Sequence, residues 1–106
     1  MSRSDRDHAT DIVGYGGDLA TLAVEIGRMR YDAQVFLLRT LAEEISRQAA
    51  ADRGRGRPRL AESLAQASAD IDRAAISLHA AWRHCRRHVP HELESRPEIP
   101  LPERRR

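Results

Sequence analysis

The sequence predicts an all-α fold, an antiparallel helical hairpin with flexible tails at both ends. We expect this hairpin to pair with another hairpin into a four-helix bundle. Apolar residues recur at spacings of three and four along two long segments, 18–52 and 58–88. A short segment rich in glycine and arginine, 53–57, separates them, and Pro58 follows it. Because the two segments are similar in length and the turn is short, we expect them to fold back on one another.

The first helix is expected to begin after a polar lead. Residues 1–17 predict a disordered or partly ordered segment, because they open with charged residues and contain three glycines around Tyr15. Asp18 is the residue type that caps a helix N-terminus. We therefore expect one helix over 18–52, in which Gly27 lowers the local stability of the helix.

The second helix carries the more regular pattern. One edge of its apolar stripe holds large residues, and the other holds alanines at positions 67, 74 and 81, widened by Ala61, Ala75 and Trp82. Small side chains allow two helix axes to approach closely, near the low end of the roughly 8–10 Å packing range. After this helix, residues 89–106 contain four of the five prolines, which predicts an extended tail.

An interface with another chain is predicted from the size of the core. The chain has 106 residues and much of its 41% hydrophobic content is alanine, so a single hairpin buries little apolar surface. Pairing two hairpins would cover the apolar edges that remain. The residues expected at this interface are Leu22, Ile26, Met29, Phe36, Leu37, Leu41, Leu64, Ile71, Leu78 and Trp82.

Composition narrows the class of protein. The single cysteine, Cys85, excludes an intrachain disulfide, which argues against a disulfide-stapled secreted domain. The most apolar stretch is far shorter than the roughly 18 residues of a membrane span. We expect a cytoplasmic protein that makes no membrane contact.

The turn suggests an alternative function. All 18 basic residues of the chain are arginine, and four of them alternate with glycine and proline here. The Arg-Gly-Arg-Pro sequence that begins at Arg55 resembles the AT-hook, a minor-groove-binding element, and the Arg-Gly-Arg loops of bacterial nucleoid silencers. The resemblance implies that bases are read by Arg55, Gly56 and Arg57, and that phosphates are contacted by Arg53 and Arg59. A glycine turn that ends a helix and carries arginines explains the same residues.

Histidines near the end of the second helix suggest a metal site as a further alternative. His84 and His88 lie one helical turn apart, a spacing suited to imidazole ligands. If the helices fold back on one another, Glu25 reaches the same level. The other explanation is structural, since a histidine near a helix C-terminus complements the helix dipole.

No Ser/His/Asp set, phosphate-binding loop or core carboxylate pair stands out in the sequence. We therefore expect a non-enzymatic helical interaction protein, without a cofactor, that oligomerises or docks as a small subunit of a larger assembly. The expected partner is a protein, either a second copy in a homodimer or a larger complex. Nucleic acid bound through the turn is the alternative partner, and a His/Glu metal-binding bundle is the other alternative function.

Overall fold

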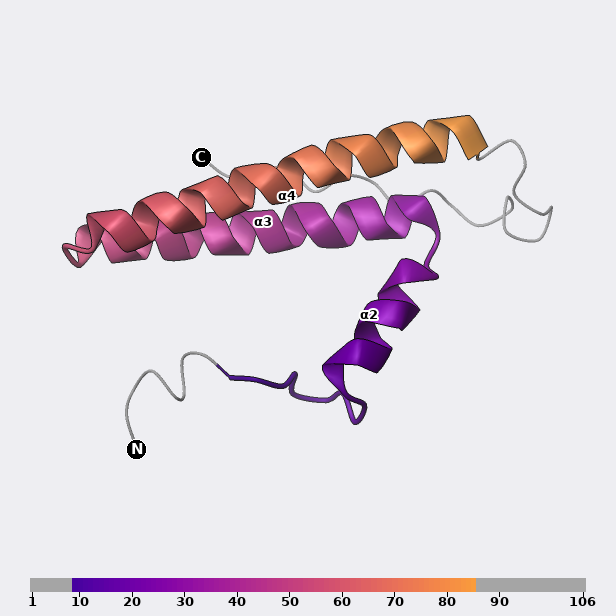
Figure 1. Cartoon of the computed structure of the whole chain (residues 1–106), viewed down its shortest axis with the longest axis horizontal. Coiled ribbons are helices and arrows are strands. Elements are labelled where there is room, and N and C mark those ends of the chain that lie inside the picture. The colour runs from indigo at the N-terminus through magenta and orange to yellow at the C-terminus, as the bar shows by residue number, and fades with distance from the viewer. Residues whose placement is uncertain (1–8, 86–106) are drawn as a thin grey trace.

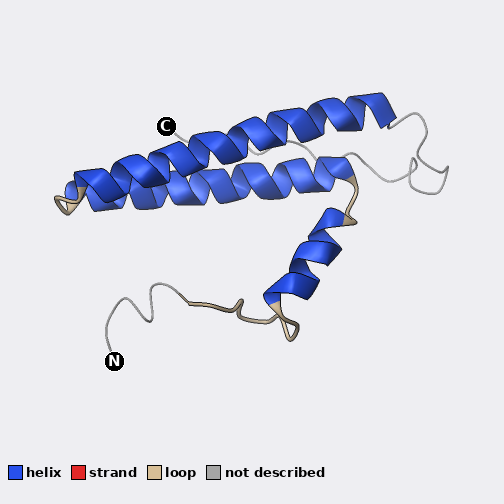
Figure 2. Cartoon of the chain, in the orientation of Figure 1, coloured by secondary structure: helices blue, strands red, loops and turns tan. Residues whose placement is uncertain are grey.

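The computed structural model describes residues 9–85, which form three helices and no strand (Figures 1 and 2). They are α2 (Leu19–Gly27), α3 (Tyr31–Gly54) and α4 (Pro58–Cys85). Helices α3 and α4 lie side by side and run in opposite directions, whereas α2 projects away from them (Figure 1). The predicted all-α class is confirmed. The expected tail 89–106 and residues 86–88 of the second helix lie outside the described residues.

The continuous helix expected over 18–52 is wrong, because the chain bends between α2 and α3. Gly27 ends α2, and glycine lowers helix stability by about 1 kcal/mol relative to alanine. Arg30 then adopts an extended backbone (φ −57°, ψ 143°) that allows a new helix to start. Asp32 lies in the first turn of α3, where a carboxylate is stabilised by the helix dipole. Gly27 followed by Asp32 is the sequence signal of this bend.

The N-terminus of α2 is capped as predicted. The Asp18 carboxylate accepts a hydrogen bond from the backbone N–H of Thr21 at 2.7 Å, which lowers the pKa of Asp18. Just before this cap, the ring of Tyr15 lies over Gly17, where a Cβ atom would come within 2.5 Å of the phenol oxygen. Partial burial, and then the nearby charge of Glu25, raise the pKa of Tyr15. Glycine at position 17 therefore lets Tyr15 fold against the start of α2.

The turn between α3 and α4 is a Schellman motif, the common helix ending in which a left-handed glycine follows the last helical turn. Gly56 has φ +76°, and the N–H of Arg57 donates to the carbonyl of Asp52 at 2.9 Å. The carbonyl of Arg57 then accepts from Ala61 N–H at 3.0 Å, which starts α4. Pro58 opens α4, as predicted, at a position where no N–H is needed.

The seam between α3 and α4 repeats every seven residues in both helices. Most of its buried residues are small, which lets the helices approach closely. The buried residues of this repeat are Val35, Ala42 and Ala49 on α3, and Ala61, Ser68, Ala75 and Trp82 on α4.

Of the two lines in the expected alanine edge of α4, the structure buries the one through Ala61, Ala75 and Trp82, whereas Ala74 in the other line is exposed. The buried line is shifted by one residue from the line through Ala67 and Ala74, which corresponds to a rotation of α4 about its own axis by about 100°. This rotation buries Trp82, the largest side chain of the helix, to 6% exposure. It also brings the hydroxyl of Ser68 to within 2.7 Å of the carbonyl oxygen of Ala42.

Candidate interaction surface

Large aliphatic side chains flank the seam on one side of the α3–α4 pair. In two right-handed helices that face each other and run antiparallel, the position three residues after a seam position lies on the same side in both. Most of those positions are half-buried leucines and isoleucines, the exceptions being the buried Asp52 beside the turn and Cys85 at the end of α4. Leu41 extends the set outward at 42% exposure. We call this set the aliphatic face; it consists of Leu38, Leu41, Ile45, Leu64, Ile71 and Leu78.

The aliphatic face carries no charge along its length. On α3 it is flanked by Gln34 and Gln48, which follow the same helical line. On α4 the corresponding line runs without a charged residue through Leu60, Leu64, Ala67, Ile71, Ala74, Leu78, Ala81 and Cys85. A long, uncharged, half-exposed apolar strip is typical of a surface that another protein covers.

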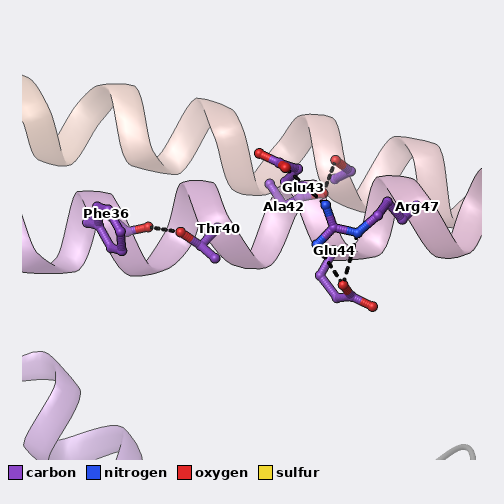
Figure 3. A network of polar contacts seen from close by, with 7 residues as sticks. Phe36, Thr40, Ala42, Glu43, Glu44 and Arg47 are labelled. Carbon is purple, nitrogen blue, oxygen red and sulfur yellow. Dashed lines mark hydrogen bonds and ion pairs between the residues drawn. The ribbon is translucent and has the colours of Figure 1, made fainter. Parts of the chain in front are cut away.

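The other side of the pair is charged. Positions four residues after the seam include Arg39, Asp72 and His79, all half-buried. Next to them Arg47 binds Glu43 at 2.9 Å and Glu44 at 2.8 Å (Figure 3). These hydrogen bonds raise the pKa of Arg47 and lower that of Glu44.

Exposed ion pairs of this kind contribute at most about 1 kcal/mol each, so this charged side is a solvated surface. The Thr40 hydroxyl, which donates to the carbonyl of Phe36 at 2.9 Å, caps no helix end and adds only a local contact (Figure 3). The two sides of the α3–α4 pair therefore differ in character, and the aliphatic face is the one suited to binding protein.

Helix α2 is apolar and buries none of its residues. Leu19 is 56% exposed and Val24 is 51% exposed. The amide of Gln34 donates to the carbonyl of Ile26 at 2.7 Å, which ties the end of α2 to α3. Because Gln34 lies one turn before Leu38 on the same line of α3, the C-terminal end of α2 lies on the side of the aliphatic face.

The open end of the pair, opposite the turn, is closed by an arginine, an aspartate and a tryptophan. The Arg30 guanidinium binds the Asp32 carboxylate through two hydrogen bonds of 2.7 and 2.9 Å. The same guanidinium lies over the Trp82 ring, 5.2 Å from its centroid, which is a cation–π contact. These contacts join the α2–α3 bend to α4. Trp82, predicted at an interface, is thus buried within the chain's own fold.

The aliphatic face includes four of the residues predicted at an interface, namely Leu41, Leu64, Ile71 and Leu78. Leu22, Ile26 and Met29 are half-buried on α2 and in the bend after it. Phe36 is exposed on the opposite side of α3 from Leu41, and Leu37 is half-buried. Sequence reasoning missed Leu38, which only the seven-residue repeat of Val35 and Ala42 identifies.

The arginines of the turn are partly engaged within the chain. Arg55 and Arg57 each place an Nη1 atom 3.4 Å from the Asp52 carboxylate. Arg53 and Arg59 are exposed on either side of them. The left-handed Gly56 gives this segment a tight turn, whereas the AT-hook resemblance implies an extended backbone. Binding of nucleic acid by these residues stays a prediction.

The residues of the predicted metal site are only partly described. Glu25 is exposed on α2 and His84 is exposed on α4, while His88 lies outside the described residues. Within residues 9–85, no group of three or more histidine, cysteine, aspartate and glutamate side chains is placed to hold a metal ion. The metal site also stays a prediction.

Comparison with protein families, curated proteins and solved structures finds no match for the chain. Within the part of the chain that the structure describes, no helix combines the length and apolar character needed to cross a membrane.

Proposed function

We propose that this chain is a non-enzymatic protein-interaction module whose aliphatic face binds another apolar helical surface, as an oligomer or as a small subunit of a larger assembly. The observation that carries the proposal is the uncharged strip of half-exposed leucines and isoleucines beside a seam of small residues. The opposite side of the same two helices holds charged residues. This contrast is typical of a helical pair that is covered on one side.

The small seam supports the proposal energetically. Among residues 9–85, Val35 is the largest side chain with less than 2% exposure. Full burial of one leucine or isoleucine contributes about 1.5–3 kcal/mol, so completing the burial of the residues of the aliphatic face, which are half-buried or, for Leu41, exposed, adds several kcal/mol. Covering the aliphatic face is therefore a large part of what would stabilise the helices.

A charge placed on the face tests the proposal. Ile71→Asp puts a carboxylate at the centre of the aliphatic face, and Ser77→Asp puts the same group on the outer surface of α4. We expect Ile71→Asp to abolish association, measured by sedimentation of the purified chain and by co-purification with proteins of the host extract. Ser77→Asp should leave association unchanged. Equal behaviour of the two variants, with helix content retained by circular dichroism, would refute the proposed function.

A further inference from the structure

We infer that a second copy of this chain covers the aliphatic face, with the two arginine turns at opposite ends, so that the end of α2 of each copy, which carries Glu25, docks against the turn of the other. The inference rests on the proposed function and names its partner. Three features support it: the size of the face, the charge of the turn, and the charge and position of segment 9–27.

The size of the face suits a dimer. The 24 residues of α3 span about 36 Å at about 1.5 Å per residue. Two helices packed about 8–10 Å apart present a surface about 20 Å wide. The product, about 700 Å² per copy for the whole side of the pair that carries the aliphatic face, is close to the roughly 800 Å² per partner of a stable protein interface. Helix α2, which buries none of its own residues, supplies further contact area.

The charge of the turn sets the orientation. Arg53, Arg55, Arg57 and Arg59 lie at one end of the pair, where Arg55 and Arg57 contact the largely buried Asp52 and Glu62 follows Arg59 by three residues on α4. A dimer with both turns at the same end would bring these like charges together. Placing them at opposite ends separates them by about 36 Å, several times the Debye length of about 8 Å at physiological salt. Like-charge repulsion thus favours the opposite-ends arrangement.

Segment 9–27 carries negative charge, whereas the turn carries positive charge. It contains Asp11, Asp18 and Glu25 and no arginine. Within one chain only the C-terminal end of α2, which carries Glu25, lies at the far end of the pair from the turn, and the chain before α2 runs back below the pair in this view (Figure 1). In the opposite-ends dimer, the turn of the partner lies at that far end. The end of each α2 therefore meets a basic turn, and the two-fold symmetry makes this contact twice.

The position of α2 agrees with this arrangement. The hydrogen bond from Gln34 to Ile26 holds the C-terminal end of α2 on the side of the aliphatic face, where the partner would lie. Val24, 51% exposed near that end, would then face the turn end of the partner. Leu60, 44% exposed in the first turn of α4, is the apolar residue available there. Apolar contact and opposite charge thus coincide at the same end.

Cross-linking between copies tests the arrangement directly. In a Cys85→Ser background, which removes the only cysteine, we would add Glu25→Cys and Arg59→Cys to the full chain. A short bifunctional maleimide should then give covalent dimers. Each single-cysteine variant is the matched control and should give few. Covalent dimers from Glu25→Cys alone would show the turns at the same end and would overturn the inference.

Charge reversal tests the contact independently. Arg59→Glu lies in the first turn of α4 and Glu25→Arg near the end of α2, so each new charge suits its helix dipole. Exposed ion pairs are worth up to about 1 kcal/mol and the contact occurs twice, so Arg59→Glu should weaken the dimer about tenfold. Adding Glu25→Arg should restore most of the affinity. The controls Asp70→Arg and Arg73→Glu, both exposed near the middle of α4, should have little effect.

The outcomes separate this inference from the proposed function. A chain that stays monomeric, yet binds another protein in a way that Ile71→Asp abolishes, keeps the proposed function and overturns the dimer. If Arg59→Glu leaves the dimer unchanged but abolishes binding to an A·T-rich duplex, the turn binds nucleic acid and the docking contact is overturned. Loss of the dimer in Ile71→Asp supports both, together with a weaker dimer in Arg59→Glu that Glu25→Arg restores.

Discussion

The hydroxyl of Ser68 donates a hydrogen bond to the carbonyl oxygen of Ala42 at 2.7 Å, across the seam of the helical pair. Both residues are buried. A polar contact in an interior of small apolar residues has few alternative partners, so it fixes how far α4 slides along α3. That register aligns the leucines and isoleucines of the two helices into one aliphatic face.

Substitution of Ser68 should show how tightly the seam is packed. Ser68→Ala removes one buried hydrogen bond and should lower the free energy of unfolding by roughly 1 kcal/mol. Ser68→Leu adds volume where the helices are closest and should cost about 1–3 kcal/mol. The exposed Ser77→Leu is the control and should change stability by no more than about 0.5 kcal/mol. Urea unfolding followed by circular dichroism measures all three.

The two glycines of the turn should respond differently to alanine. Gly56 has φ +76°, so Gly56→Ala places a Cβ in a left-handed conformation and should cost about 1–2 kcal/mol. Gly54 is the last residue of α3 and has open space around it, so Gly54→Ala should be neutral or stabilising by up to about 1 kcal/mol. Thermal unfolding of the two variants compares them. An equal loss in both would contradict the Schellman geometry of the turn.

The contact between Arg30 and Trp82 should be visible in fluorescence, because Trp82 is the only tryptophan. Arg30→Lys keeps the charge but loses the planar, two-pronged contact with Asp32. We expect a red shift of the emission of Trp82 and a loss of roughly 1 kcal/mol in unfolding free energy. Arg28→Lys, at a neighbouring exposed position, is the control. Unchanged emission in Arg30→Lys would show that the guanidinium does not shield the ring.

The cap of α2 should depend on pH. The hydrogen bond from Thr21 holds the pKa of Asp18 below its ordinary value of 3.8. A carboxyl group whose pKa is lower when folded stabilises the fold above its ordinary pKa, and this contribution disappears as pH falls through the lowered value. The amide signal of Thr21 should therefore shift in acid, together with loss of α2 helix. Asp18→Asn retains a capping oxygen but does not titrate, and should abolish this shift.

The sequence predicts the helices well where a local signal acts alone. Asp18 and Pro58 mark helix starts through the chemistry of their own side chains and backbone, and the structure confirms both. Gly56 likewise marks the end of α3, because few other residues adopt its backbone conformation. The bend before α3 escaped prediction because Gly27 is tolerated inside many helices. It is decisive only together with Asp32 and the extended Arg30.

The facing surfaces of the helices were harder to predict than their ends. Alanine occupies two neighbouring lines of α4, one through Ala67 and Ala74 and one through Ala61 and Ala75, so periodicity alone does not choose between them. The choice depends on burial of Trp82 and on the hydrogen bond of Ser68, which require the position of the other helix. For the same reason Leu38 was not assigned to an interface, whereas Leu64, Ile71 and Leu78 were.

Sedimentation equilibrium of the full chain and of Ile71→Asp over a wide range of concentration tests most directly whether a second copy covers the aliphatic face. We expect the wild-type chain to approach twice its 12.0 kDa mass as concentration rises, and Ile71→Asp to stay at the mass of one chain. A wild-type chain that remains a monomer at every concentration, or an Ile71→Asp variant that dimerises as well as the wild type, would contradict the claim that a second copy covers the aliphatic face.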